Sequence, residues 1–334
     1  MMRRPLLVLV LTAAAAAAAP AAAHAQLPGQ PVPKPAPPAP APAAGGKMSI
    51  SVKSGLPTRR SHYVARGQRV LVVGTVTNFV AGQLARVRVV RKGKVLVRRR
   101  TRIKKIRKGG QFVVRFKAKK SGALRIVADH QASPQQAASR ARSARVNVVR
   151  WQTGQGARGT RVLLLQRELL ALGYATPLTG SYDDGTSRAV LAFRKVNNLG
   201  RDGFATAGVY DRLLRRTGAF KPRYPKAGKH VEFSWTKQVV VLAQGGKPWR
   251  VYHASSGKPS TPTVFGSFRF YSKTPGTNSH GMVDSNYFIG GYAIHGYPEV
   301  PTYAASHGCI RVPIPNAAAI FAWIKLGDPI FVYS

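Results

Sequence analysis

Between residues 47 and 150 the sequence alternates apolar and cationic residues with a period of two. The stretch RVRVVRKGKVLVRRR at 86–100 shows this most clearly, and further short runs rich in β-branched residues share it, separated by Gly, Lys-Gly or Ser-Gly turns. Because successive side chains of a strand point to opposite faces, the pattern predicts strands with one buried and one charged face. Six or seven such strands in about 100 residues favour an immunoglobulin-like β-sandwich.

The charge of this segment is extreme. It contains 28 lysines and arginines but a single acidic residue, Asp129, and the whole chain carries a formal net charge of +43. Such a field favours anionic partners. Two interpretations stay open: a solvated spacer domain that its charge keeps soluble, or a domain that adheres to anionic cell-wall polymers. Nucleic acid is disfavoured, because the chain carries an export signal and no aromatic-interleaved recognition motif.

That export signal occupies the first 25 residues. MMRR supplies a positive start, LLVLVLTAAAAAAA an apolar run, and Ala23-His24-Ala25 a small-x-small cleavage pattern. We therefore expect an exported protein of the cell wall, periplasm or extracellular space. An uncleaved signal anchor would be its one contact with a membrane. Residues 26–46 are Pro- and Ala-rich and predict an extended spacer.

Residues 151–220 change to helical spacing and predict a small three-helix bundle. Three amphipathic runs follow one another, ARGTRVLLLQRELLALGY, SRAVLAFRKVNNLG and RDGFATAGVYDRLLRR. The segment resembles the peptidoglycan-binding type 1 domain, which implies contact with the cell wall. The residues that carry this resemblance are Leu165-Gln166, Leu172-Gly173-Tyr174, Thr186, Ala189-Val190 with Phe193, and Asp202-Gly203. Arg194 replaces the glutamine usual in that family, which leaves the strength of wall binding open.

Residues 230–334 return to strand patterns, add a helix over 315–326, and contain the only cysteine of the chain, Cys309. A single cysteine excludes an intrachain disulfide and a thiolate zinc site. A thiol reacts as thiolate and has a free pKa of about 8.5, so a catalytic Cys309 needs a base or a positive field. The alternative is a small buried apolar residue. The candidate bases are His230, His253, His280, His295 and His307.

The surroundings of Cys309 resemble the YkuD-type L,D-transpeptidase catalytic domain. His295 is followed after ten residues by Ser306-His307-Gly308-Cys309-Ile310-Arg311, the order and residue types of that family's motif. This spacer is shorter than in many members. Further similarity lies in Ser255-Ser256-Gly257, Thr261-Pro262-Thr263, Gly266-Ser267-Phe268 and Gly327-Asp328-Pro329. The resemblance implies a mainly-β catalytic domain.

The resemblance also implies roles for individual residues. Cys309 is the expected nucleophile and His295 its proton acceptor and donor, oriented by a backbone carbonyl such as that of Gly296. His307 is expected to shape the pocket and to form an oxyanion hole with the amides of Gly308 and Cys309.

Four residues are assigned to the substrate side of the site. Ser306 is expected there as a support of the loop, and Gly296 as the source of the orienting carbonyl. Arg311 stands where many members have Asn, and its charge either holds a stem-peptide carboxylate or only braces the loop. His280 either lines the substrate cleft or belongs to a surface loop.

The expected function is that of an exported peptidoglycan L,D-transpeptidase. The resemblance implies that Cys309 attacks the third residue of a tetrapeptide stem, releases D-Ala, and passes the acyl group to a second stem as a 3→3 cross-link. Water as acceptor makes an L,D-carboxypeptidase, and a protein amine makes a protein-to-peptidoglycan ligase. A non-catalytic wall-binding protein is the alternative of another class, against which the intact His295–Cys309 pair argues. No metal or organic cofactor is required.

Overall fold

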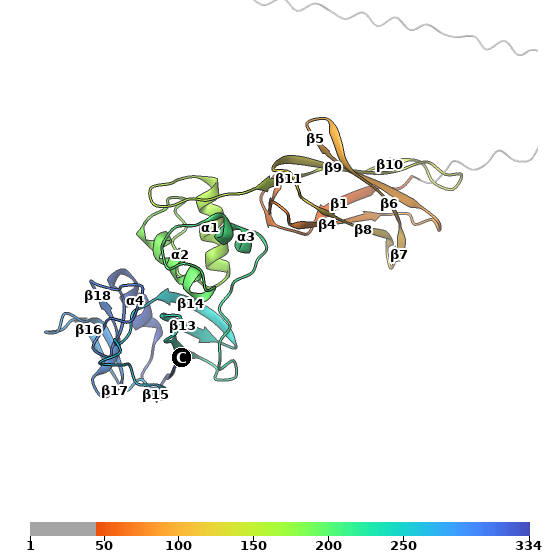
Figure 1. The fold of residues 1–334 in the computed structure, drawn as a ribbon. Coiled ribbons are helices and arrows are strands. Elements are labelled where there is room, and N and C mark those ends of the chain that lie inside the picture. Colours follow the sequence, from red (N-terminus) through yellow and green to blue (C-terminus); the bar gives the residue numbers. More distant parts are fainter. Residues whose placement is uncertain (1–44) are drawn as a thin grey trace, which may run out of the picture. The chain divides into compact units, whose positions relative to one another are not determined.

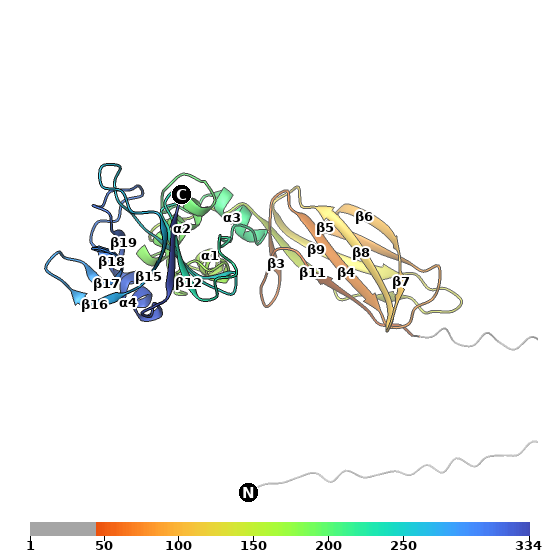
Figure 2. The same ribbon diagram turned by 90° about the horizontal axis from the view of Figure 1, so that it is seen from below.

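The computed structural model describes residues 45–334, a mainly-β stretch with four helices (Figures 1 and 2). The predicted signal peptide, 1–25, and all but the last two residues of the predicted spacer, 26–46, lie outside the described residues. Within 45–334 no helix is both long and apolar enough to cross a membrane.

The basic segment forms two sheets around one core. The first has the order β1-β4-β8-β7: β1 Met48–Val52, β4 Arg69–Val76, β8 Gly109–Lys117 and β7 Lys104–Ile106. The second has the order β2-β3-β11-β9-β5-β6, with β10 beside β9: β2 Leu56–Pro57, β3 His62–Ala65, β11 Ala144–Val149, β9 Gly122–His130, β5 Leu84–Arg91, β6 Lys94–Arg102 and β10 Ser139–Arg140. Valines of both sheets are buried in the shared core, such as Val72 and Val87. The alternating pattern thus gives strands as expected, while the immunoglobulin-like topology stays a prediction.

Three helices follow, α1 Thr160–Ala171, α2 Asp184–Val196 and α3 Ala207–Leu214. Side-chain caps start two of them: Asp183 accepts from the Thr186 amide at α2, and Thr206 accepts from the Val209 amide at α3. Helix α1 contacts both α2 and α3. Their buried side chains share one cluster with Val239, Val241 and Val251 of the following sheet, and α2 packs on that sheet.

The C-terminal segment combines two sheets and one helix. One sheet has the order β14-β13-β12-β20-β15: β14 Lys247–His253, β13 Val239–Gln244, β12 His230–Ser234, β20 Pro329–Tyr333 and β15 Gly266–Arg269. The other has the order β16-β17-β18-β19: β16 Ser272–Thr277, β17 Val283–Ile289, β18 Tyr292–Tyr297 and β19 Ile310–Pro313. Helix α4, Ile314–Trp323, packs against β17, β18 and β19. It ends before the predicted residue 326, because Ile324 takes an extended conformation and is fully buried.

Candidate active site

Two neighbouring parallel strands bring His295 and Cys309 to one face of a sheet. His295 lies on β18, and Cys309 comes directly before β19. The two strands pair Ile294 with Ile310, and both isoleucines are fully buried in the core. Successive side chains of a strand alternate between its two faces. His295, directly after Ile294, and Cys309, directly before Ile310, therefore both project from the face opposite the two isoleucines. The structure thus places the predicted base on β18 and the predicted nucleophile at the start of the adjacent strand β19.

His295 is held as a neutral imidazole with a defined tautomer. Its ring is 3% exposed, and Nδ1 lies 2.9 Å from the carbonyl oxygen of Gly296. A carbonyl only accepts, so the Nδ1–H donates to it and Nε2 keeps its lone pair. Burial lowers the pKa of His295 more than this hydrogen bond raises it, and the charge of Arg311 lowers it further. A neutral ring with a free Nε2 is the state that a general base requires.

Cys309 is half-buried and protonated at rest. Its thiol donates to the carbonyl oxygen of Gly291, with 3.6 Å between sulfur and oxygen. Burial raises the pKa of the thiol, against the opposing effects of a backbone hydrogen bond from Ala293 and the charge of Arg311. Because the neutral thiol is a weak nucleophile, the site depends on a base that removes its proton.

The loop before Cys309 is fixed by its own hydrogen bonds. The Gly308 amide donates to Oγ of Ser306 at 3.1 Å, and its carbonyl accepts from Oγ1 of Thr263 at 2.6 Å. Gly308 has φ +123°, and a Cβ there would lie 2.0 Å from the ring of Tyr292, so only glycine fits. The expectation for Gly308 differs from this geometry: its N–H is engaged by Ser306 and does not point to an oxyanion.

Ser306 acts on the loop from within. It is 1% exposed, and its Oγ donates to the Cys309 carbonyl at 2.5 Å while accepting from Gly308. The hydroxyl has both of its hydrogen-bond partners within the loop, a geometry that matches the expected role of Ser306 as a support of the loop. Gly296 contributes only its carbonyl, since a Cβ there would lie 2.8 Å from Cβ of Ala317 on α4.

The structure does not join the other predicted histidines to the thiol. His307 is exposed, and its Nε2 lies 3.4 Å from Nζ of Lys258. His280 is exposed in the turn between β16 and β17, where its amide donates to Asn278 Oδ1 at 3.0 Å. His230 is buried against Glu232, with 3.1 Å between Nε2 and Oε1.

Arg311 offers a positive charge beside the site. It lies opposite His295 in the β18–β19 register, and its guanidinium lies 4.0 Å from the ring centroid of Tyr297. Its backbone N–H and carbonyl both bond to Ser255, at 2.8 and 2.9 Å. Among residues 45–334 no carboxylate forms an ion pair with it. The bracing comes from its backbone, and the side-chain charge remains available to an anionic ligand.

A buried lysine links helix α2 to the segment between His295 and Cys309, and no sequence pattern predicted it. Nζ of Lys195 lies 2.8 Å from Nδ1 of His253, 3.1 Å from the Gln238 carbonyl and 3.0 Å from the Ala254 carbonyl. His253 in turn donates from Nε2 to the Val300 carbonyl at 2.8 Å. Burial and the adjacent Lys195 lower the pKa of His253 to about 3, so the imidazole is neutral. A lysine three residues after buried Ala192, on the apolar side of α2, is the one sequence signal of this link.

Lys195→Met should therefore impair the active site from a distance. It leaves the Ala254 carbonyl and His253 Nδ1 buried without their donor, and leaves the Gln238 carbonyl with the Ala254 amide as its donor at 3.1 Å. We expect this to cost at least about 2 kcal/mol of unfolding free energy. Because His253, the partner of the Val300 carbonyl, is then no longer held by Lys195, the segment between His295 and Cys309 loses its fixed position. We therefore expect kcat to fall more than KM rises. Denaturant unfolding and steady-state kinetics measure the two effects.

The matched control is Lys237→Met. Lys237 also contacts the helical segment, through the Val196 carbonyl at 3.1 Å and Asn198 at 3.2 Å, but it does not bond to His253. Its loss should lower stability slightly and leave kcat within about twofold of wild type. An equal loss of kcat in both variants would contradict the proposed link.

Comparisons with known proteins identify two segments of the chain. A family model described as L,D-transpeptidase catalytic domain (YkuD) matches residues 228–332, and one described as putative peptidoglycan binding domain matches residues 158–213. Both resemblances predicted from the sequence are confirmed.

Individual relatives agree with these matches. L,D-transpeptidase 1 of two Mycobacterium tuberculosis strains is 34% identical over 30% of this chain and 48% of its own length, so the chain spans about half the length of these curated relatives. The crystal structure of the L,D-transpeptidase (residues 123–326) from Xylanimonas cellulosilytica DSM 15894 is 33% identical with a TM-score of 0.51, covering 55% of this chain and 98% of that one.

Proposed function

We propose that this chain, which belongs to the YkuD family of L,D-transpeptidases, is an exported acyltransferase that acts on peptidoglycan stem peptides through Cys309. The observation that carries the proposal is the pair of neutral groups on adjacent strands. The protonated thiol comes directly before β19, and the buried imidazole lies on the neighbouring strand β18, with its Nδ1–H bound to Gly296 and its Nε2 free to accept. Such a pair generates a thiolate when substrate is in place.

The first half-reaction forms a thioester. Nε2 of His295 takes the thiol proton, and the sulfur of Cys309 attacks the carbonyl carbon of the third stem residue. The resulting tetrahedral oxyanion collapses, the bond to D-Ala breaks, and His295 returns the proton to the departing amine. The Nδ1–H bond to Gly296 holds the ring in one orientation through both proton transfers.

The second half-reaction reverses the first with a new amine. The side-chain amine of a second stem attacks the thioester carbonyl, and His295 takes its proton. The C–S bond breaks, the proton returns to Cys309, and a 3→3 cross-link remains. Water in the same position would release a tripeptide, and a protein amine would attach that protein to the wall.

Charge stabilisation involves the Cys309 amide and Arg311. Because the Gly308 N–H is engaged by Ser306, the backbone amide of Cys309 is the proposed donor to the oxyanion. The guanidinium of Arg311, which no carboxylate within residues 45–334 neutralises, is proposed to bind a stem carboxylate. His307 and His280, both exposed, border the entrance in this proposal.

The remaining segments are proposed to hold the enzyme at the wall. The matched peptidoglycan-binding segment supports contact with glycan strands. The signal sequence of residues 1–25 supports export. Residues 47–150 contain 28 lysines and arginines and one acidic residue, a charge that supports adhesion of an immunoglobulin-like sandwich to anionic wall polymers.

The products made from a purified disaccharide-tetrapeptide test this function. We expect free D-Ala together with a 3→3 cross-linked dimer, because one stem serves as acyl donor and another as acceptor. Separation of the products by liquid chromatography with mass spectrometry, over a time course, distinguishes the possibilities. Tripeptide without dimer would indicate a carboxypeptidase instead. Binding of the muropeptide with no D-Ala released would indicate a wall-binding protein without catalysis.

A further inference from the structure

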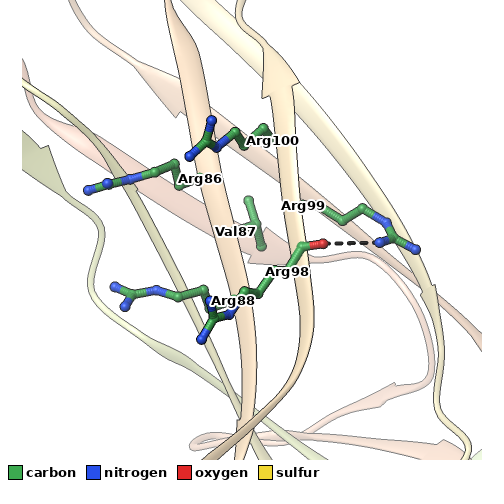
Figure 3. A pocket seen from close by; sticks show the side chains of 6 residues that line it. All are labelled: Arg86, Val87, Arg88, Arg98, Arg99 and Arg100. Carbon is green, nitrogen blue, oxygen red and sulfur yellow. Dashed lines mark hydrogen bonds between the residues drawn. The ribbon is translucent and has the colours of Figure 1, made fainter.

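Arginines lie directly opposite one another on the face of the second sheet that points away from the core. β5 and β6 pair Arg86 with Arg100 and Arg88 with Arg98. In Figure 3 these four side chains extend to one side of the two strands, and Arg99 extends to the other, where its Nη1 donates to the Arg98 carbonyl at 3.0 Å. The group lines a hollow of about 360 Å³. Like charges at directly opposed positions destabilise a sheet, so this arrangement calls for a compensating anion.

The described chain supplies that anion only in part. Asp129 on β9 accepts from Nε of Arg86 at 2.8 Å and from Nη2 of Arg88 at 3.1 Å. It is 5% exposed, and both carboxylate oxygens are engaged. Within residues 45–334 no ion pair reaches Arg98 or Arg100. Two guanidinium groups at the hollow therefore remain uncompensated.

Protection of a sheet edge does not explain the arrangement. Cations on an edge strand keep sheets from pairing with one another, and β6 is an edge strand. The opposed arginines continue further in, however, because β5 is an interior strand and β9 and β11 pair Arg125 with Arg145. Leu124 and Val146, next to them in sequence, are buried, so Arg125 and Arg145 point to the same outer face.

We propose that this arginine face binds a linear polyol-phosphate polymer of the cell wall. It consists of Arg86, Arg88, Arg98, Arg100, Arg125 and Arg145. Guanidinium groups bind phosphate oxygens in a bidentate manner. The inference names a ligand for the proposed adhesion to the wall and rests on that proposed function for the location of the polymer.

The spacing of the arginines selects the polymer. Arg86 and Arg88, and likewise Arg98 and Arg100, are two residues apart along a strand, which is six backbone bonds and about 6.6–6.8 Å. Successive phosphorus atoms in a polymer with a three-carbon polyol are also joined through six bonds, P–O–C–C–C–O–P. An extended polymer that lies along the strands on this face therefore presents successive phosphates to successive arginines. Each of the two strands contributes one row of arginines to the contact.

Binding of the full chain to three fluorescent polyanions of equal charge tests the inference. The probes are a polyglycerol phosphate oligomer, a polygalacturonate and a single-stranded DNA, measured by anisotropy at several salt concentrations. We expect polyglycerol phosphate to bind at least about tenfold more tightly than the others, with affinity falling steeply with salt. Equal affinity for all three would overturn the inference, as would a preference for DNA, which would make nucleic acid the partner.

Two double variants of matched charge locate the site. R98Q/R100Q should weaken polyglycerol phosphate binding at least about tenfold and reduce the salt slope by about 1.4, as expected for two lost contacts to a single strand. R115Q/K105Q removes the same charge from exposed positions on β8 and β7 of the other sheet and should change affinity by less than about twofold. Equal losses in the two variants would overturn the site.

Thermal unfolding without polymer gives a second readout. Because R98Q/R100Q removes one partner from each opposed pair, its melting temperature should rise above wild type, and a fall would contradict the repulsion on which the inference rests. Polymer binding does not depend on turnover. Retained binding without D-Ala release would count against the proposed function alone, and D-Ala release without binding against this inference alone.

Discussion

Cys309→Ala should abolish D-Ala release, lowering kcat/KM by a factor of at least about 10⁴, because no other group in the site can form the thioester. Cys309→Ser should be nearly as inactive, since a hydroxyl is far less acidic than the thiol that His295 must deprotonate. Both changes are small at a half-buried position, so melting temperatures should stay within a few degrees of wild type. Release of D-Ala is followed with a coupled oxidase assay. Activity above about 1% of wild type in the alanine variant would contradict the assignment.

His295→Gln should lower kcat/KM by about 10²–10⁴, the contribution typical of a positioned general base. The pH dependence of kcat/KM tests more specifically whether His295 is the base. Burial keeps the pKa of His295 below its usual 6.5, so the imidazole is neutral above that pKa and wild-type activity should be lost only as pH falls through it. In the variant the rate should follow the thiolate of Cys309, whose pKa is raised by burial, and grow about tenfold per pH unit below that pKa.

His307→Gln distinguishes the two histidines that flank the site. His307 is nearer to Cys309 in sequence, but it is exposed and contacts Lys258. The acid limb of the pH profile should survive in this variant, even if substrate binding weakens. Loss of the acid limb in His307→Gln with its retention in His295→Gln would reverse the two roles.

Sequence alone predicted the features that rest on periodicity and on a short motif. Alternation at 86–100 predicted the strands β5 and β6, and in β5 the period of two also predicted which side chains are buried. In β6 no side chain is fully buried, because it is the edge strand of the sheet. The motif at 306–311 and its resemblance to the family put His295 and Cys309 together as a predicted pair, while the parallel pairing of β18 with β19 was found only in the structure.

Features that depend on packing between distant segments were not predicted. Lys195 is 2% exposed because three acceptors from other segments surround its Nζ, and the sequence of α2 does not show which segments supply them. Gly308 reads as an oxyanion donor, yet its N–H is engaged because the Ser306 hydroxyl folds back on the loop. The shared core of the helices and β13 escaped prediction for the same reason, since no local pattern specifies which faces meet.

The most direct test of the thioester on Cys309 is intact-protein mass spectrometry. The enzyme is mixed with a tetrapeptide donor and quenched in acid within milliseconds to seconds. We expect a wild-type adduct equal in mass to the donor minus D-Ala, located by peptide mapping on Cys309. It should be absent from Cys309→Ala and lost on treatment with hydroxylamine, which cleaves thioesters. An adduct on another residue, or D-Ala release by the Cys309→Ala variant above about 1% of the wild-type rate, would contradict this mechanism.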